Sequence, residues 1–258
     1  MHVDTFSVPV DAAAAPTGTT NAVVVAGDET LLVDPAGRTD ALDTVVAEKG
    51  IDHVAVTHAH PDHVDAVADY AAETDATVWA RVGRESRFRA ATGVAPDRTF
   101  RDGDRVGPAT VVDTPGHAPD HVGFETVAGV VCGDLAVAEG SVAVAAPEGD
   151  VRAYLTSLRR LYARDPDRLF PGHGPTVTRP RAVCRRLIDH RLRRERAVAA
   201  AVADGADTVS AVVDAAYEKN LDGVRDLARA TVRAHVEKLA RAGRVRWDPE
   251  ADRVTPAE

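Results

Sequence analysis

The stretch THAHPDHVD, residues 57–65, places three histidines within six positions of a chain that has only ten histidines in 258 residues. It directly follows the apolar run VAV, which predicts a short strand, and open sheets place ligand sites at the carboxyl ends of their strands. His58 and His60, two positions apart on an extended segment, can point to one metal ion. Asp62 and His63 project from the turn that follows and offer an oxygen and a nitrogen to a second ion. We therefore expect a metal site in this loop.

Two metal ions need more ligands than these four, and the later sequence supplies candidates where further strands should end. His117 follows the apolar run 109–113, Asp134 follows 130–132, and His173 follows a short apolar pair. Each stands beside a glycine, which lets the backbone turn tightly. With these residues, five of the ten histidines are assigned to one site.

Composition bounds the class of protein. The chain is 45% hydrophobic and 28% charged, as in globular proteins, and its net charge of -9 argues against a surface coated in positive charge for non-specific nucleic-acid binding. The net charge does not exclude a local basic groove. No segment is apolar enough to span a membrane, and the N-terminal stretch lacks the features of a secretory signal, so we expect a cytoplasmic protein. Two cysteines, Cys132 and Cys184, are too few for a disulfide framework.

Two segments of different character divide the chain. Up to about residue 180, short β-like runs alternate with turns and helical patches, which indicates a sheet protein with flanking helices. After Pro180 the pattern is that of three helices, and the tail RVRWDPEADRV predicts a small hairpin. Helix, helix, helix, hairpin is the outline of a winged helix. We therefore expect an α+β protein with a domain at 1–180 and a small winged-helix domain at 181–258.

The order of these motifs resembles the metallo-β-lactamase superfamily over nearly all of the first 180 residues. The resemblance rests on HAHPDH at 58–63 and on the three later ligand candidates. It implies a four-layer αββα sandwich with two zinc ions in a groove at one edge of the two sheets. The ligand sets that the family pattern implies are His58, His60 and His117 for the first ion, Asp62, His63 and His173 for the second, and Asp134 as the bridge between them.

Three further segments resemble the lactamase-beta-like protein 2 group, which carries a winged helix after the lactamase domain and includes a single-strand-specific endoribonuclease. These segments are GDLAVAEGSVAV at 133–144, LFPGHGPTV at 169–177 and HRLRRERAV at 190–198. Hydroxyacylglutathione hydrolases share the HxHxDH motif. This chain lacks the Cys-Gly-Arg segment that follows their bridging aspartate and helps to bind glutathione, so glutathione thioesters rank low as substrates.

The mechanism that the site implies is metal-assisted hydrolysis. Two zinc ions roughly 3.5 to 4 Å apart lower the pKa of a shared water, so that a bridging hydroxide can attack, and they polarise the oxygen under attack. Asp62 is the candidate catalytic carboxylate, because it can orient that hydroxide or accept its proton. Histidine-rich sites with carboxylates favour zinc and also admit iron or manganese. In the family pattern, His121 is a donor behind the ligands or a substrate contact; a plain surface histidine is the alternative.

Arginines indicate where an anionic substrate would bind. Arg84 and Arg87 belong to the arginine-rich segment 81–101, which we expect either as a loop over the groove that binds an anion or as a solvated face paired with Glu85 and Asp97. A second excess of arginine lies on the helix that opens the C-terminal segment, where it would suit phosphate contacts.

Three functions stay open on this basis. The leading one is hydrolysis of single-stranded RNA, with small esters or thioesters as the alternative. The second is a nucleic-acid-binding regulator that uses the winged helix, on which Arg225, Arg229 and Arg233 form a stripe. The third, a metal-binding scaffold without turnover, is disfavoured by the full ligand set. The winged helix can instead serve for packing or dimerisation, so a homo-oligomer also stays open.

Overall fold

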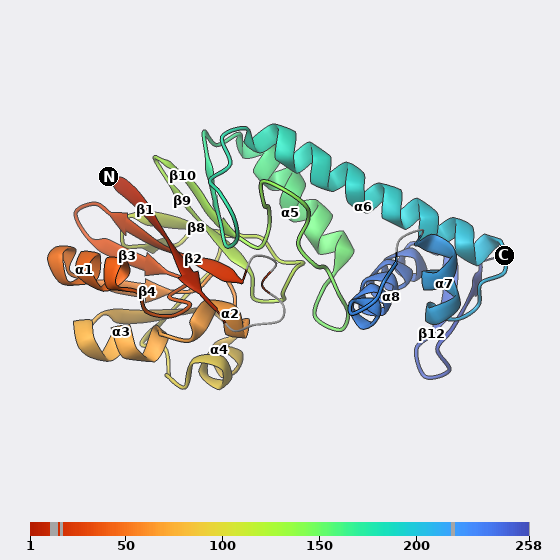
Figure 1. Cartoon of the computed structure of the whole chain (residues 1–258), viewed down its shortest axis with the longest axis horizontal. Coiled ribbons are helices and arrows are strands. Elements are labelled where there is room, and N and C mark those ends of the chain that lie inside the picture. The colour runs from red at the N-terminus through yellow and green to blue at the C-terminus, as the bar shows by residue number, and fades with distance from the viewer. Residues whose placement is uncertain (11–14, 16–17, 218–219, 258) are drawn as a thin grey trace.

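The computed structural model describes residues 1–10, 15, 18–217 and 220–257, and strands β1 to β11 form two stacked sheets (Figure 1). The first sheet contains, in spatial order, β1 (His2–Pro9), β2 (Thr19–Ala26), β3 (Thr30–Val33), β4 (His53–Ala55), β5 (Thr77–Arg81) and β6 (Arg98–Phe100). The second contains β11 (Leu169–Pro171), β10 (Gly129–Gly133), β9 (Val122–Thr126), β8 (Ala109–Asp113) and β7 (Arg105–Val106).

Successive side chains of a strand pack into different hydrophobic cores, one between the two sheets and one on the outer face of each sheet. On β2, Val23 and Val25 point into the core between the two sheets, whereas Val24 points into the core on the outer side. On β10, Val131 lies in the core between the sheets and Val130 in the core on the other outer side. Because successive side chains of a strand face opposite ways, one apolar run serves two cores at once.

Helices cover both outer faces and complete the four layers expected from the sequence (Figure 1). Those that pack on the first sheet are α1 (Asp40–Lys49), α3 (Val67–Thr74) and α4 (Glu85–Thr92). The second sheet is covered by α5 (Val151–Arg164) and the first half of α6 (Pro180–Ala203). A single turn, α2 (Pro61–Val64), follows β4.

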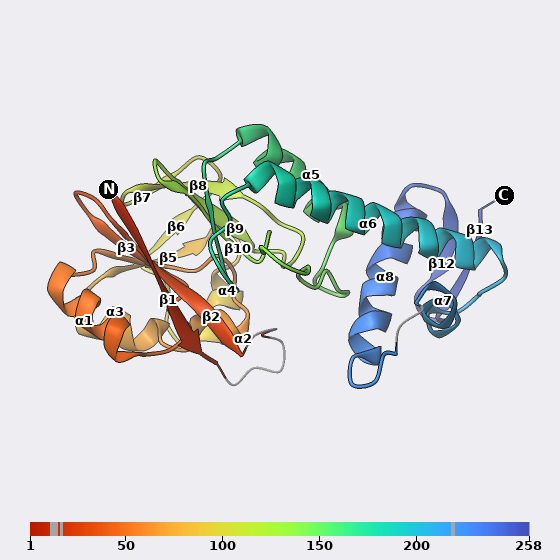
Figure 2. The same cartoon turned by 45° about the horizontal axis from the view of Figure 1, so that its top comes forward.

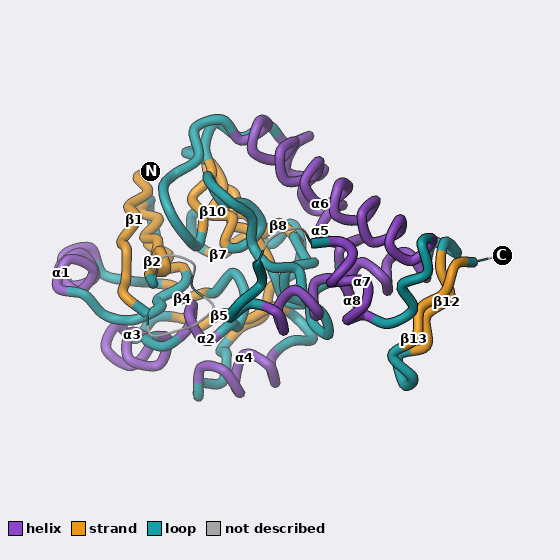
Figure 3. Tube along the Cα trace, turned by 45° about the vertical axis from the view of Figure 1, so that its right-hand side comes forward, coloured by secondary structure: helices purple, strands orange, loops and turns teal. Residues whose placement is uncertain are grey.

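The C-terminal elements follow the expected order. They are α6, α7 (Val209–Ala216), α8 (Arg225–Arg241), β12 (Val245–Asp248) and β13 (Arg253–Pro256). Figures 2 and 3 show α6 running from the sheets to α7 and to the terminal hairpin. Leu187 of α6 belongs to the core on the second sheet, whereas Val198 and Val202 belong to the C-terminal core. One helix therefore joins both cores.

The structure of residues 81–101 contradicts one of the two arrangements expected for this segment, the loop over the groove. The segment is not a loop over the groove, because it contains the last residue of β5, helix α4 and strand β6. Phe88 is the cause: its side chain is buried in the core on the outer face of the first sheet, which fixes α4 there. Within the described ranges, no helix has both the length and the apolar character to cross a membrane.

Packing of α5 on the second sheet gives a test of this architecture. Leu158 is fully buried in that layer, so Leu158→Ala should lower the free energy of unfolding by about 2–5 kcal/mol. The neighbouring Arg159 is exposed, and Arg159→Ala should change it by less than about 0.5 kcal/mol. Urea denaturation measures both variants. Equal losses would contradict the placement of α5.

Candidate metal centre

Asp34 anchors the start of the histidine loop. It directly follows β3, and β3 pairs in parallel with β4, so the carboxyl ends of both strands meet at one edge of the sheet. The backbone N–H of Thr57 donates to Asp34 Oδ1 (2.6 Å), and the Thr57 hydroxyl donates to Asp34 Oδ2 (2.7 Å). Further along, the N–H of Ala59 donates to Asp120 Oδ2 (2.9 Å). Two buried carboxylates thus fix the backbone before α2, which Pro61 begins.

Two glycines let later loops approach this one closely. Gly116, just before His117, has φ of +136°, and an added Cβ would overlap the backbone of Tyr154. Gly172, just before His173, faces the cluster itself: an added Cβ would lie 2.6 Å from Asp134 Oδ1. A side chain at either position would displace the histidine that follows or fill the space between the candidate ligands.

The first group of candidate ligands brings three imidazole nitrogens together. His58 Nε2 and His117 Nε2 each lie 3.0 Å from His60 Nδ1. Ligands about 2.0–2.1 Å from a tetrahedral zinc ion lie roughly 3.3 Å apart. The observed spacing therefore fits one ion with little movement.

The second group adjoins the first and is joined to it by a carboxylate. Asp62 Oδ2 lies 3.5 Å from His173 Nε2 and 3.8 Å from His63 Nε2. Asp134 reaches both groups, because its Oδ2 is 3.6 Å from His117 Nε2 and its Oδ1 is 3.4 Å from His173 Nε2. All seven side chains expected at a metal site are therefore brought together in the structure.

Outward hydrogen bonds determine which imidazole nitrogen faces the centre. The outward nitrogens of His63, His117 and His173 donate to acceptors that carry no hydrogen. These pairs are His63 Nδ1 with Asp34 Oδ2 (3.0 Å), His117 Nδ1 with the Ala143 carbonyl (2.7 Å) and His173 Nδ1 with the Thr19 carbonyl (2.9 Å). A neutral imidazole that donates from one nitrogen has only a lone pair on the other. The inner Nε2 atoms are therefore acceptors.

The remaining two histidines follow the same rule. The Thr57 hydroxyl gives its hydrogen to Asp34, so its oxygen accepts from His58 Nδ1 (3.0 Å). His60 is turned the other way, and its Nε2 donates to Glu148 Oε2 (3.1 Å). In these tautomers the lone pairs face one another at 3.0 Å and cannot form hydrogen bonds with each other, an arrangement that a shared cation would stabilise.

Burial and charge favour the same interpretation. Burial, together with the neighbouring imidazoles, holds the pKa of His58 well below its usual value, which keeps the ring in the neutral form that binds metal. Burial lowers the pKa of His63, but Asp34, with Asp134 and Asp62, outweighs it and raises that pKa to about 9, so a metal ion would have to displace a proton from its inner nitrogen. Among the described residues, Asp34, Asp62 and Asp134 contact histidines and no arginine or lysine. Three buried carboxylates need a positive charge, which metal ions would supply.

The three candidate substrate contacts have different surroundings. His121 is fully buried, and both ring nitrogens are used: Nδ1 donates to Thr114 Oγ1 (2.8 Å), and Nε2 accepts from the backbone N–H of Asp134 (3.0 Å). The ring therefore holds Asp134 in position and has no nitrogen left for a substrate. Arg87 forms ion pairs with Glu148 and Asp120. Arg84 is exposed beside a cavity that Glu148 also lines.

Three functional carboxylates were missing from the candidates that the sequence supplied: Asp34, Asp120 and Glu148. Asp34 had one signal, because it directly follows an apolar run just as the recognised candidates do. The others contact the histidine loop across 61 and 88 residues of chain. Nothing local marks residues that act over such separations.

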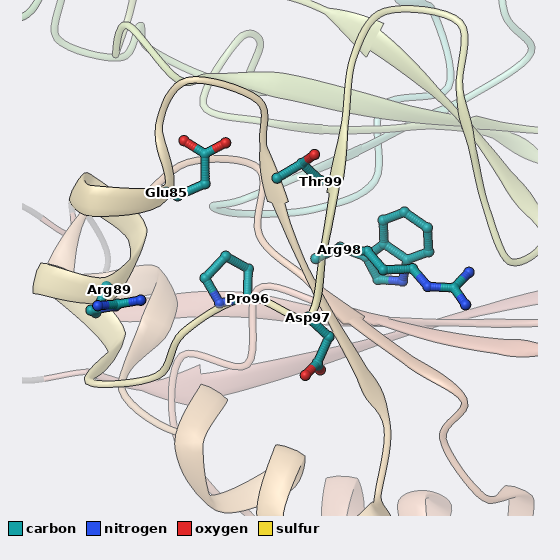
Figure 4. A pocket seen from close by; sticks show the side chains of 7 residues that line it. Glu85, Arg89, Pro96, Asp97, Arg98 and Thr99 are labelled. Carbon is teal, nitrogen blue, oxygen red and sulfur yellow. The ribbon is translucent and has the colours of Figure 1, made fainter.

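A further cavity, of about 590 Å³, lies between α4 and β6 (Figure 4). Among the described residues, its lining includes Glu85, Arg89 and Asp97 but no histidine, and Glu85 and Asp97 point away from each other. It contributes no side chain to the candidate metal centre.

Known proteins resemble the chain over 62% to 91% of its length. A protein from Drosophila melanogaster named "Beta-lactamase-like protein 2 homolog" is 28% identical over 91% of this chain and 86% of its own. "Atrochrysone carboxyl ACP thioesterase AgnL7" from Paecilomyces divaricatus is 28% identical over 88% of this chain and 76% of its own. A "Hydroxyacylglutathione hydrolase" from Acidiphilium cryptum is 31% identical over 62% of this chain and 65% of its own.

The fold is shared with solved structures as well. A metallo-beta-lactamase family protein from Thermus thermophilus superposes with a TM-score of 0.79 at 23% identity, covering 98% of each chain. The sequence pattern of the family described as "Metallo-beta-lactamase superfamily" matches residues 15–173, which contain all seven candidate ligands. The chain therefore belongs to the metallo-beta-lactamase superfamily, whose members are hydrolases.

Proposed function

We propose that the chain is a two-metal hydrolase of esters or thioesters. His58, His60 and His117 would hold one ion, Asp62, His63 and His173 the other, and Asp134 would contact both. One observation carries this proposal: every imidazole of the cluster uses its outer nitrogen as a donor, so that five lone pairs face inward. Zinc suits this set of imidazoles and carboxylates, and iron or manganese would also fit.

Bound metal ions would supply a water of lowered pKa and a positive charge that polarises the carbonyl. The chain supplies the remaining steps. Asp62 is 6% exposed and lies beside His173, where it can accept the proton of the attacking water. The His60 side chain is 27% exposed, whereas those of His63 and His173 are at most 4% exposed, so a substrate would approach from the side of His60.

A thioester or ester is favoured over RNA as the substrate. A relative at 28% identity over most of the chain is named a thioesterase. Arg186 of α6, which would suit a phosphate contact, has partners within the chain. Its Nη2 donates to the carbonyls of Val137 and Ala138, so this nitrogen is not free to contact a phosphate.

The regulator alternative, in which residues 181–258 act as a winged-helix domain on nucleic acid, has less support. Its arginine stripe on α8 has partners on the protein: Arg225 with Asp214, Arg229 with the Ser210 hydroxyl, and Arg233 with Glu237. These pairs are exposed and would have to break before phosphates could bind. A surface pair contributes little, so its loss would cost little, but no observation favours that exchange.

Metal content tests the proposed centre. Wild-type protein should carry two metal ions per chain, and Asp134→Ala should lower that content because both ions lose a ligand. Elemental analysis after exhaustive dialysis measures this. His2→Ala is the matched control, since His2 is exposed and distant in sequence from the cluster, and it should keep both ions. Equal metal content in all three proteins would rule out the assignment.

Parallel assays with a thioester and with RNA test the substrate class. A small S-acyl thioester should be hydrolysed by the metal-loaded protein, and Asp62→Ala should lower kcat/KM by at least about 100-fold, the usual contribution of a general base. End-labelled single-stranded RNA, incubated in parallel, should stay intact. The proposal would be wrong, and the protein a ribonuclease, if the wild-type protein cleaved RNA but did not hydrolyse the thioester, and if Asp62→Ala abolished the RNA cleavage.

His121 offers a test of positioning. Because its ring holds the backbone of Asp134 and has no free nitrogen, His121→Ala should lower kcat and metal content together and leave KM within about twofold. Steady-state kinetics with the same thioester separates the two constants. A rise in KM alone, with full metal content, would show a substrate contact instead.

A further inference from the structure

Three adjoining cavities lead from the histidine cluster to the gap between α6 and the C-terminal helices. The first, of about 200 Å³, is lined by His173 and the segment 137–142. The second, of about 270 Å³, shares Ser141 and Val142 with the first. The third, of about 600 Å³, shares Tyr217 with the second. Each cavity shares lining residues with the next, so the three adjoin one another, and we call them together the α6 groove.

Apolar side chains form one wall of the α6 groove. Val224 and Leu227 line its second cavity and are each 48% exposed, although most large apolar side chains of the described chain are buried. Leu221 and Ala228 extend the same wall. Apolar surface left in water is stabilised by contact with an apolar ligand, at about 25 cal/mol per Å².

Cationic side chains of α6 form another part of the lining. Arg191, Arg193 and Arg194 line the second and third cavities, beside His190. No aspartate or glutamate is among the described residues that line these two cavities, although the chain as a whole has a net charge of -9. Burial and the nearby arginines together lower the pKa of His190 to about 4, which reflects the positive potential of this part of the lining.

The guanidinium groups are held by neutral partners, so their charge stays available. Arg191 is 3% exposed, donates to the Val142 carbonyl, and packs over the Tyr154 ring, while its Nε has no hydrogen-bond partner among the described atoms. Arg194 donates to the carbonyl of Ala216 and stacks 3.6 Å from the centre of the Tyr217 ring. Carbonyls and rings orient an arginine without neutralising it.

From this geometry we propose that the α6 groove binds an anionic group of the substrate, separated by an apolar segment from the carbonyl at the metal centre. Arg194 is the residue that selects it. This inference rests on the proposed ester or thioester hydrolysis. The anion has two chemical sources: a carboxylate at the far end of the acyl group, or a phosphate on a phosphopantetheine leaving group.

Kinetics with three thioesters test the proposal. The substrates are a neutral octanoyl N-acetylcysteamine, an acyl N-acetylcysteamine with a terminal carboxylate, and octanoyl-CoA. Arg194→Gln removes the charge and keeps a donor for the Ala216 carbonyl. It should raise KM about tenfold or more for an anionic thioester, because a hydrogen bond to a charged group is lost, and leave the neutral thioester within twofold. Arg185→Gln is the matched control, since this exposed arginine of α6 contacts Tyr162 instead.

Each outcome either identifies the source of the anion, the acyl group or the leaving group, or contradicts the proposal. An effect on the carboxylate substrate alone assigns the groove to the acyl group, and an effect on octanoyl-CoA alone assigns it to the leaving group. Unchanged KM for both, with the neutral thioester turned over, overturns the groove assignment and leaves the hydrolase intact. If no thioester is hydrolysed, the proposed function fails, and calorimetry with octanedioate and CoA still tests the groove.

Discussion

Five imidazoles that each turn one nitrogen toward a shared centre are the constraint on which the rest of this structure depends. Each ring is oriented by a hydrogen bond on its outer side, to a carboxylate, a carbonyl or a hydroxyl. Three inner nitrogens lie 3.0 Å apart in two contacts, and none of them carries a hydrogen to share. Without a cation this arrangement would be strongly unfavourable, because buried acceptors would lose water and gain no donor. The fold therefore holds the site ready for metal ions.

Residues outside the histidine cluster hold the candidate ligands in place. Asp34 ties the loop after β4 to the end of β3, and its Oδ2 also orients His63. Gly172 keeps clear the space into which Asp134 points. On the open side, Glu148 orients His60 and forms an ion pair with Arg87. Such outer partners fix the position and the tautomer of each candidate ligand. The local motif alone cannot do this, because the partners come from distant parts of the chain.

The sequence was sufficient to find the candidate ligands that the structure brings together, but it did not reveal the carboxylates that orient them. His58 to His63 form one local motif after an apolar run, and His117, Asp134 and His173 repeat the same arrangement at other strand ends. Asp120 and Glu148 have no such context, because the strand order alone brings them to the loop.

The arginines of α6 show a second limit of the same kind. Their sequence reveals charge, but their partners are backbone carbonyls, as for Arg186 and Arg194, and carbonyls leave no trace in a sequence. A loop over the groove, one of the two expectations for the segment 81–101, is wrong for a related reason, because the buried side chain of Phe88 holds α4 against the first sheet.

The most direct test of this account is anomalous diffraction from crystals of the metal-loaded protein. Two peaks are predicted, one within bonding distance of His58 Nε2, His60 Nδ1 and His117 Nε2, and the other at Asp62, His63 and His173, with Asp134 between them. The absence of metal at these nitrogens, or imidazoles that bind through their outer nitrogens, would contradict it.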